Sequence, residues 1–327
     1  MKLKSELEQI LQTDNTIAIA GHVRPDGDCI GACLGLYHYI KANYPEKELT
    51  IYLEQTSEKF SYLKEIEEIK HDCEKEKEKS YDCFFMLDCG ETERLGFSGI
   101  LFQNAKKTVC IDHHISSGKM ADKNYIFPEA AATCEILFDF MEEDKIPLDS
   151  AIALYTGLIH DTGVFKHSNT TQNTMEIAGK LIAKGVPFTE IINHSFYQKT
   201  YIQNQILGRA LLESIVFFNG TCIFTALRQK DMEFYGGSAD DLDGIVDQLK
   251  ITKGIICAIF LYESEPQKYK VSLRSDAPID VSKVAKHFGG GGHIRAAGCS
   301  MLGSVHDVIN NLSSEIEKQM QEWNKGV

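Results

Sequence analysis

Long apolar runs are missing from this sequence of 327 residues, which argues against a membrane-spanning helix. The first twelve residues, MKLKSELEQILQ, read as a charged amphipathic helix without the apolar core or cleavage site of a secretory signal. The ten cysteines contain no CxxC pair, so neither a disulfide framework nor a zinc ribbon is indicated. Cys29 and Cys33, one helical turn apart, are expected to be buried packing residues rather than metal ligands. We therefore expect a cytoplasmic protein with reduced thiols.

Positive charge is also scarce. Lysine and arginine number 34 against 47 aspartate and glutamate residues, which gives a net charge of -13. A protein that binds long duplex nucleic acid needs a basic face that displaces many counterions. Bound divalent ions can still attract a small anion locally. The composition thus favours a short, negatively charged substrate and excludes long duplex nucleic acid and a membrane as partners.

The length of the chain indicates two domains, since one hydrophobic core seldom grows this large. In the N-terminal half, short apolar runs alternate with helical patterns, which is typical of βαβ units and a parallel sheet with helices on both faces. The strand candidates are Thr16–Ala20, Leu49–Leu53, Tyr81–Leu87 and Lys107–Ile111. The predicted fold class is α/β.

Domain boundaries follow from the stop signals. A helical pattern runs through residues 131–183, and Gly185-Val186-Pro187 then ends a first domain predicted at 1–186. Residues 187–209 predict a helical connector, and residues 210–327 a smaller α/β domain with a mixed sheet. Its strand candidates are Glu213–Phe218, Cys222–Leu227, Ile255–Tyr262 and Tyr269–Leu273.

The first strand candidate leads into GHVRPDGD, residues 21–28. His22, Asp26 and Asp28 thus follow a strand, and the proline and glycine of this turn can direct the two carboxylates toward a common point. Imidazole together with carboxylate suits a divalent ion such as Mn²⁺. An acidic helix N-cap would account for one of the aspartates but not for the histidine.

The next two strand candidates also end in ligand-type residues, Asp88 and then Asp112-His113-His114. Open α/β sheets bind ligands outside the carboxyl ends of their strands, so these residues are expected to share one site. A lone aspartate after a strand is usually a turn residue, but the Asp-His-His triplet lacks that explanation. Asp161, at the end of an apolar helical run, is a further candidate.

The number of candidate carboxylates favours two metal ions over one. Two divalent ions carry four positive charges, which four aspartates balance. These are Asp26, Asp28, Asp88 and Asp161. His160 and His167 are isolated among apolar neighbours and are predicted to be structural.

These motifs together resemble the DHH-family phosphoesterases, named for the triplet seen here at 112–114. The segments GHVRPDGD, LDCG and LIHDTG are similar to the other acidic motifs of that family. In the C-terminal half, SLRS at 272–275 and GGGGHIRAAG at 289–298 are similar to the DHH-associated domain that holds nucleotide substrates. The resemblance spans most of residues 14–300.

The resemblance implies two divalent ions, Mn²⁺ in preference to Mg²⁺ because of the histidine ligands. One ion would be held by His22, Asp26, Asp88 and Asp161, and the other by Asp28, Asp88 and His113. Asp88 would bridge them, His114 would contact the scissile phosphate, and Asp112 would orient the histidines. Which of His113 and His114 is the ligand stays open at this point. Such a pair of ions activates water for displacement at phosphorus, so no protein nucleophile is needed.

The glycine run at 289–292 leaves the backbone free to approach a ligand and to offer N–H donors to phosphate oxygens. On its own it is more typical of a turn after the helix predicted at 281–288. The resemblance favours a substrate site instead. The expected substrate-binding residues are Arg274, Ser275, Gly290, Gly291, Gly292, His293 and Arg295.

We therefore expect a Mn²⁺-dependent phosphodiesterase that degrades short oligoribonucleotides to mononucleotides and also acts as a 3'-phosphoadenosine 5'-phosphate (pAp) phosphatase. The alternative is a phosphodiesterase for cyclic di-AMP or its linear product pApA. A RecJ-type exonuclease fits less well, because it normally has a longer chain and a more basic surface. A family II inorganic pyrophosphatase resembles the N-terminal motifs, but its lysine- and arginine-rich phosphate motif is not found here, and the GGGGH run argues against it. A non-catalytic nucleotide-binding module is disfavoured because all six ligand positions hold competent residues. The resemblance also raises the hypothesis of a homodimer formed through the first domain.

Overall fold

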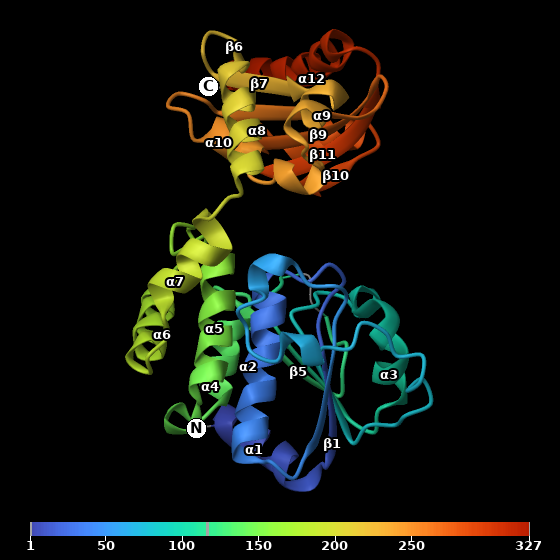
Figure 1. The fold of residues 1–327 in the computed structure, drawn as a ribbon, viewed down its shortest axis with the longest axis vertical. Helices are drawn as coiled ribbons and strands as arrows, with labels where there is room; N and C mark the ends of the chain where they lie inside the picture. Colours follow the sequence, from blue (N-terminus) through green and yellow to red (C-terminus); the bar gives the residue numbers. More distant parts are fainter. Residues whose placement is uncertain (1, 116–117, 327) are drawn as a thin grey trace. The chain divides into compact units, whose positions relative to one another are not determined.

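The computed structural model describes residues 2–115 and 118–326, and the chain divides into two compact units, residues 1–198 and 199–327 (Figure 1). This division falls inside the segment 187–209 that the sequence predicts as a helical connector. Among the described residues, no helix combines the length and the apolar character needed to cross a bilayer.

The first unit is built on a five-stranded parallel sheet in the order β2-β1-β3-β4-β5. Its strands are β1 (Thr16–Ala20), β2 (Glu48–Tyr52), β3 (Cys83–Leu87), β4 (Thr108–Asp112) and β5 (Lys123–Ile126). The four strands predicted from apolar runs are present. The sequence analysis missed β5, because this edge strand has only four residues and begins with Lys-Asn, so it lacks an apolar run.

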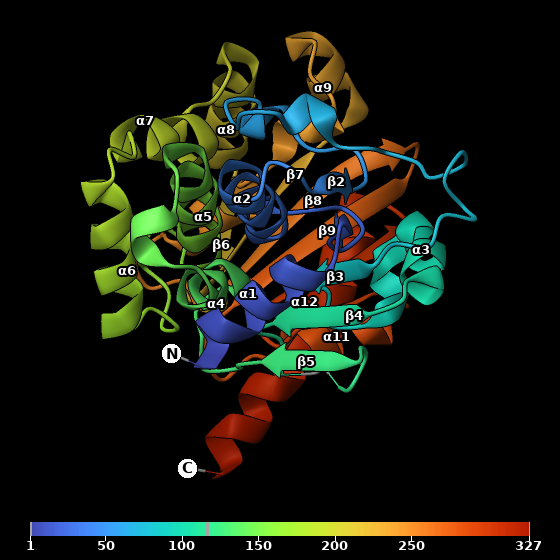
Figure 2. The same cartoon turned by 90° about the horizontal axis from the view of Figure 1, so that it is seen from below.

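Helices cover both faces of this sheet, as predicted. They are α1 (Lys2–Thr13), α2 (Gly27–Asn43), α3 (Gly99–Asn104), α4 (Thr133–Phe140), α5 (Leu148–Asp161), α6 (Gln172–Ala183) and α7 (Phe188–Ile192). Along β1, Ile17 and Ile19 join the core under α1, α2, α4 and α5, while Ala18 and Ala20 join the core under α3. Figures 1 and 2 show α3 on the side of the sheet opposite to α2 and α5. A short π-helix, Asn193–Tyr197, follows α7.

The second unit has a six-stranded mixed sheet in the order β10-β11-β9-β8-β7-β6, in which only β7 and β8 pair in parallel. Its strands are β6 (Ile215–Phe217), β7 (Cys222–Leu227), β8 (Cys257–Glu265), β9 (Lys268–Ser275), β10 (Gly291–His293) and β11 (Ala296–Leu302). Four of these were predicted. No strand was predicted in the glycine-rich run, but Gly291 and Gly292 lie in the edge strand β10, because β11 supplies hydrogen-bonding partners that the sequence pattern does not reveal.

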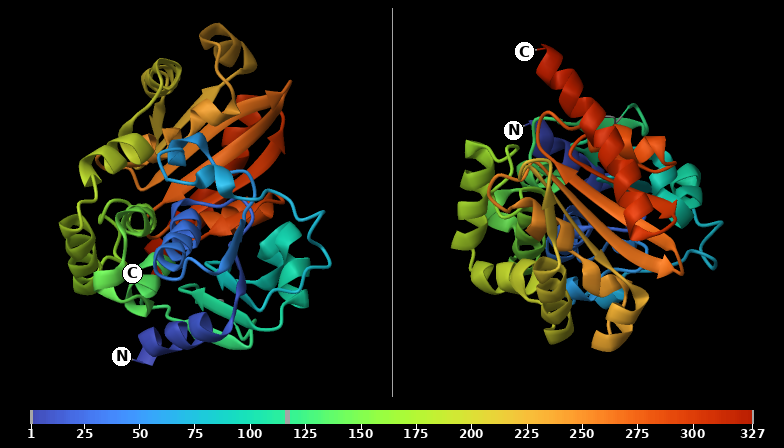
Figure 3. Two further views of the ribbon diagram at one scale, coloured as in Figure 1. Left: turned by 60° about the horizontal axis from the view of Figure 1, so that its bottom comes forward. Right: turned by 90° about the horizontal axis from the view of Figure 1, so that it is seen from above.

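Helices also cover both faces of the second sheet. They are α8 (Tyr201–Leu212), α9 (Gln229–Tyr235), α10 (Ile245–Lys250), α11 (Val281–His287) and α12 (Val305–Gly326). One core lies under α8 and α10, and another lies under α11 and α12. Figure 3 (right) shows α12, in red, across the orange strands.

The close crossing of α2 and α5 brings two site-bearing helix ends together at the first sheet. Gly31 in α2 makes this possible, because a Cβ built there would lie 2.5 Å from the Ala153 carbonyl oxygen and 2.9 Å from the Gly157 nitrogen. Both neighbours are backbone atoms of α5, which cannot move away independently of their helix. The two helices therefore pack backbone against backbone.

This contact predicts that Gly31→Ala destabilises the protein by about 1–3 kcal/mol, as overpacking in a core usually does. Gly179 in α6 is the matched control, since a Cβ there would meet nothing within 4 Å. Gly179→Ala should stabilise the protein by about 0.5–1 kcal/mol through helix propensity. Thermal unfolding of both variants measures the difference. Equal effects of the two substitutions would contradict the proposed packing constraint.

Candidate metal centre

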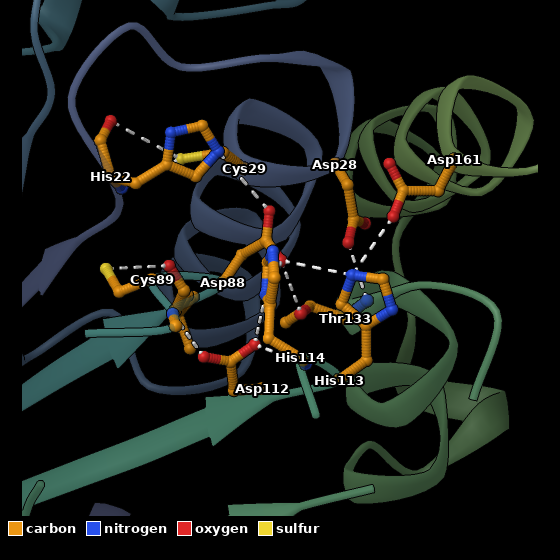
Figure 4. A network of polar contacts seen from close by, with 12 residues as sticks. His22, Asp28, Cys29, Asp88, Cys89, Asp112, His113, His114, Thr133 and Asp161 are labelled. Carbon is orange, nitrogen blue, oxygen red and sulfur yellow. Dashed lines mark hydrogen bonds and ion pairs between the residues drawn. The ribbon is translucent and has the colours of Figure 1, made fainter. Parts of the chain in front are cut away.

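The acidic and histidine residues predicted as metal-binding or catalytic converge at the carboxyl edge of the first sheet (Figure 4). They come from the ends of three strands, from the N-terminus of α2 and from the C-terminus of α5. These residues are His22, Asp26, Asp28, Asp88, Asp112, His113, His114 and Asp161. Parallel strands order their carboxyl ends along one edge, so the topology alone explains why residues distant in sequence meet here.

Asp88 lies at the centre of this cluster. Its side chain is 2% exposed, and its backbone has a φ of 59°, which is uncommon for a residue with a Cβ. The Asp88 Oδ2 lies 3.6 Å from His22 Nε2, and its Oδ1 lies 3.5 Å from His113 Nε2. One oxygen of this carboxylate therefore faces each histidine. Burial and the neighbouring Asp28 carboxylate raise the pKa of Asp88 well above its usual value.

The Oδ2 side of Asp88 faces His22 and Asp26. The His22 Nδ1 bonds to the Val23 carbonyl at 2.8 Å, and its Nε2 lies 3.6 Å from Asp26 Oδ2. Asp26 is also the N-cap of α2, because its Oδ1 accepts from the backbone N–H groups of Asp28 and Cys29. Burial opposes ionisation of Asp26, but the bonds from His22 and from these N–H groups outweigh it and lower the pKa to about 2. The carboxylate therefore serves as helix cap and candidate ligand at once.

The Oδ1 side of Asp88 faces a second group, formed by Asp28, His113 and Asp161. Their candidate ligand atoms lie within 4.8 Å of one another, and His113 Nε2 is 3.1 Å from Asp161 Oδ2. Asp28 accepts from the backbone N–H groups of Thr133 and Cys134 at the start of α4, at 2.6 and 3.0 Å. Burial and the nearby Asp161 raise the pKa of Asp28 to about 7.

The surroundings of His113 show why this set of side chains fits divalent cations. His113 Nδ1 lies 3.4 Å from the Ala130 carbonyl, while its Nε2 faces Asp88 and Asp161. A ring with acceptors at both nitrogens must be protonated or must bind a cation. Burial opposes protonation, but Asp161 and Asp28 prevail and raise the pKa of His113 to about 9. The same excess of negative charge that raises the pKa values of Asp28 and Asp88 is what divalent ions would neutralise.

His113 and His114 point in different directions, which the sequence could not tell. His114 donates from its Nδ1 and from its backbone N–H to Asp112 Oδ1, at 2.7 and 3.0 Å. The other oxygen of Asp112 accepts from the Gly90 N–H at 2.6 Å. Burial opposes ionisation of Asp112, but these bonds outweigh it and lower the pKa to about 2. His114, 34% exposed, also lies near the centre, with its Nδ1 3.6 Å from Asp88 Oδ1. The geometry favours His113 as the metal ligand, because its Nε2 faces both Asp88 and Asp161 while His114 Nδ1 is bonded to Asp112.

One part of the predicted ligand set does not match the structure. The resemblance grouped Asp161 with His22 and Asp26, but Asp161 lies with Asp28 and His113. The physical reason is the position of α5, whose C-terminus lies beside the N-terminal turns of α2 and α4. The contact between α2 and α5 that fixes this position is not visible in any local motif.

Sequence analysis also missed residues that support the ligands. Thr133 donates from its hydroxyl to Asp88 Oδ1 at 3.0 Å. The Arg94 Nη1 donates to the Cys89 carbonyl at 3.0 Å, and the Arg94 carbonyl accepts from the Val23 N–H at 2.7 Å, so this residue links the two turns that carry His22 and Asp88. A threonine at a helix start and an arginine in a short turn are common, and neither carries a signal of this role in sequence.

Other predicted roles can be compared with the structure. All ten cysteines are free and buried, as expected for reduced thiols. Cys29 lies near His22 and Asp88, but its Sγ accepts the His22 N–H at 3.2 Å, and burial raises the pKa of its thiol well above the usual value. The His160 ring packs on Phe60 and Phe196, and burial lowers its pKa to about 4. His167 bonds through Nδ1 to the Asp161 carbonyl at 3.2 Å.

In the second unit, strand register aligns several predicted substrate-binding residues. His293, Ala296 and Arg274 are directly paired across β10, β11 and β9 and therefore share one face of the sheet. The next row on that face holds Gly291, Gly298 and Ser272. Ala296 lies between His293 and Arg274, and together with Gly291 and Gly298 it forms a surface of small residues, here called the floor. The Arg274 Nε pairs with Asp247 Oδ1 at 2.8 Å.

Two of the predicted substrate-binding residues are engaged within the second unit. The Ser275 hydroxyl donates to the Ile279 carbonyl at 2.7 Å, and its side chain is 4% exposed. The Arg295 Nη1 donates to the same carbonyl at 2.8 Å. Two of the glycines are required by packing, since a Cβ on Gly290 or Gly292 would collide with β11. Gly291 is not, because a Cβ there would be in open space.

Substitutions of His113 and of His114 should change the affinity for Mn²⁺ by different amounts. We expect His113→Ala to weaken Mn²⁺ binding by at least about tenfold, because it removes a candidate ligand. His114→Ala should leave Mn²⁺ affinity within about threefold, since its Nδ1 is hydrogen-bonded to Asp112 at 2.7 Å and lies farther, 3.6 Å, from Asp88 Oδ1. Calorimetric titration of both variants measures this. The reverse order of the two effects would show that the assignment is wrong.

The affinity for Mn²⁺ should depend on pH. A cation binds the deprotonated carboxylates, so it must displace the protons that the raised pKa values of Asp28 and Asp88 retain. Affinity should therefore fall as pH falls below 7, by up to about tenfold per pH unit for each proton displaced. Titrations at pH 6 and pH 8 check the sign. Equal Mn²⁺ affinity at pH 6 and pH 8 would contradict the raised pKa values of Asp28 and Asp88.

Both units of the chain match known protein domains. Residues 16–158 match the model of the DHH family, N-terminal domain, and residues 221–322 match that of the DHHA1 domain. A bifunctional oligoribonuclease and PAP phosphatase NrnA from Thermus thermophilus is 28% identical, covering 92% of this chain and 89% of that protein. The protein of the same name from Bacillus subtilis is 25% identical, covering 98% of this chain and 99% of its own.

A more distant relative and a solved structure complete the comparison. The cyclic-di-AMP phosphodiesterase GdpP of Bacillus subtilis is 23% identical over 96% of this chain, which spans about half of that longer protein, 49%. The crystal structure of an exopolyphosphatase-related protein from Bacteroides fragilis has a TM-score of 0.87 at 22% identity, covering 97% of this chain and 96% of that one. The fold is thus a known one. The chain contains a DHH N-terminal domain followed by a DHHA1 domain.

Proposed function

We propose that this protein is a two-metal, Mn²⁺-dependent phosphodiesterase that hydrolyses short oligoribonucleotides to mononucleotides and removes the 3'-phosphate of pAp. The observation that carries the proposal is the central Asp88, with one carboxylate oxygen facing His22 and the other facing His113. The names of the relatives from Thermus thermophilus and Bacillus subtilis support the substrate class.

The site would hold one ion between His22, Asp26 and Asp88, and the other among Asp28, Asp88, His113 and Asp161. Four carboxylates in this set balance two divalent ions, which leaves the site able to accept an anionic phosphate. Two imidazoles among the ligands favour Mn²⁺ over Mg²⁺, which prefers oxygen ligands. Such ions supply a nucleophilic water and Lewis-acid stabilisation of the phosphoryl oxygens.

The remaining residues position and stabilise the reacting groups. Asp112 holds His114 with its Nδ1 as donor, so that Nε2 is the nitrogen that meets the scissile phosphate. Through the Gly90 N–H, the same carboxylate holds the turn that carries Asp88. Asp112 thus places a substrate-contacting ring and the bridging ligand in one arrangement. This division of roles agrees with the partial exposure of His114 and the complete burial of Asp112.

The second unit would bind the end of the substrate. The floor of Gly291, Gly298 and Ala296 lets a flat base approach the backbone closely, with His293 available for stacking and Arg274 for a phosphate. Asp247 holds the Arg274 guanidinium in a fixed orientation. Ser275 and Arg295 would support this surface rather than contact the ligand, since their polar atoms bind Ile279. The net charge of -13 agrees with a short substrate.

Cellular location and assembly form part of the same proposal. Ten free, buried cysteines suit a reducing compartment, which supports the cytoplasm. A homodimer through the first unit could use an edge strand of its sheet, β2 or β5, because an edge strand offers unpaired backbone groups. Light scattering tests the dimer, and a monomer mass would remove it.

The function is tested by product release from labelled RNAs of two to about twenty nucleotides, alongside pAp, pApA and cyclic di-AMP, with Mn²⁺ and with EDTA. We expect Mn²⁺-dependent turnover that is fastest on the shortest RNAs. Asp88→Asn should reduce it by at least about a thousandfold, because it weakens the ligand shared by both ions. Asp14→Asn is the matched control, since Asp14 is an equally buried aspartate, 3% exposed, that pairs with Lys107 away from the site.

The outcomes separate the candidate functions. Strong preference for cyclic di-AMP or pApA would favour the second candidate, second-messenger turnover, which the likeness to the cyclic-di-AMP phosphodiesterase supports. Turnover that survives EDTA, or that Asp88→Asn leaves unchanged, would overturn the two-metal proposal.

A further inference from the structure

Thr133, the first residue of α4, connects the two carboxylates that line the Oδ1 side of the centre. Its backbone N–H donates to Asp28 Oδ2 at 2.6 Å, and its hydroxyl donates to Asp88 Oδ1 at 3.0 Å. The residue is fully buried, with 0% exposure. Figure 4 shows it with dashed lines to Asp28 and to Asp88. We propose that Thr133 is a positioning residue. It fixes the orientation of the Asp88 carboxylate and thereby sets the affinity for the ion on the Oδ1 side, among Asp28, Asp88, His113 and Asp161.

The hydroxyl acts on the terminal torsion of Asp88, about the Cβ–Cγ bond, which sets the orientation of its carboxylate. The position of the Asp88 Cα is held by the turn whose Gly90 N–H binds Asp112, but rotation about the Cβ–Cγ bond would exchange or tilt the two oxygens. A donor on Oδ1 fixes this rotation and keeps Oδ2 directed toward His22. In a buried site such a hydrogen bond is stronger than in water. A neutral hydroxyl also adds no positive charge that would compete with a cation.

The segment that carries Thr133 is itself firmly anchored. Cys134 donates its N–H to the second oxygen of Asp28 at 3.0 Å, and the Ala130 carbonyl lies 3.4 Å from His113 Nδ1. In α5, Gly157 leaves room for this arrangement, because a Cβ there would lie 2.7 Å from Asp28 Oδ1. One short segment, residues 130–134, therefore contacts Asp28, Asp88 and His113. The Thr133 hydroxyl is the member of this set that a substitution can remove without altering the backbone.

This inference rests on the two-metal function proposed above, and its test reads metal binding directly. Thr133→Val keeps the shape and the backbone N–H to Asp28 but removes the hydroxyl, while Thr133→Ser restores it. Thr156→Val is the matched control, because Thr156 is equally buried and its hydroxyl bonds to Tyr62 and to the Ile152 carbonyl instead of to a ligand. Calorimetry of Mn²⁺ binding and the paramagnetic resonance signal of a coupled manganese pair are the two measurements.

We expect wild-type protein and Thr156→Val to bind two Mn²⁺ ions and to give the coupled-pair signal. Thr133→Val should bind one of the two ions at least about tenfold more weakly and lose that signal at Mn²⁺ concentrations that saturate the wild type. Thr133→Ser should bind both ions within about threefold of the wild type. Raising the Mn²⁺ concentration should restore the turnover of Thr133→Val with little change in the KM for RNA.

Each contrary outcome has its own meaning. Wild-type protein that does not bind two ions would overturn the two-metal function and this inference with it. Wild-type binding of two ions with unchanged affinity in Thr133→Val would overturn the role of Thr133 alone, as would an equal loss in Thr156→Val. If Thr133→Val does not fold, as judged by its thermal unfolding, Thr133→Ala removes the same hydroxyl and takes its place under the same criteria.

Discussion

Repulsion among buried carboxylates is the constraint on which the first unit depends. Asp28 and Asp88 are almost completely removed from water, with Asp161 beside them, and an uncompensated arrangement of this kind is costly in a medium of low dielectric constant. The structure offsets part of this cost with fixed donors: the N-terminus of α4 for Asp28, and the hydroxyl of Thr133 for Asp88. These neutral donors do not offset the whole cost, since burial and the neighbouring carboxylates still raise the pKa values of Asp28 and Asp88. This excess of negative charge is what the proposed divalent ions would neutralise.

The fold supplies what this centre needs before any ligand binds. A parallel sheet brings three strand ends to one edge, and the tight crossing of α2 and α5 brings Asp28 and Asp161 to the same place. Because the ligands lie on strand ends and on helix termini, their positions are set by the core and not by long loops. Asp112 and Thr133 then orient the side chains that the backbone alone would leave free to rotate. Preorganisation of this kind is what a two-metal phosphodiesterase requires.

The second unit has a different design. Its sheet presents small residues where β9, β10 and β11 pair, so that a row of backbone is accessible between His293 and Arg274. The two arginines near this surface are both engaged: Arg274 pairs with Asp247, and Arg295 donates to the Ile279 carbonyl. Such a surface suits the end of a short nucleotide better than a long strand, which would need many unpaired cations. The proposed division between catalysis in the first unit and end recognition in the second agrees with the acidic composition of the whole chain.

The sequence by itself determined the class of fold, eight of the strands, and the identity of the acidic and histidine residues that meet at the sheet edge. It could do so because apolar runs, turn residues and strand-end motifs are local signals. The short polar edge strand β5 and the pair β10–β11 were not predictable in this way, since their stability comes from neighbouring strands. Only the tertiary structure decided that Asp161 joins Asp28 and His113, that His113 and His114 have different partners, and that Thr133 binds Asp88. These contacts depend on the packing of α2, α4 and α5 over the sheet, and side-chain directions across such distances in sequence are fixed by packing rather than by local pattern.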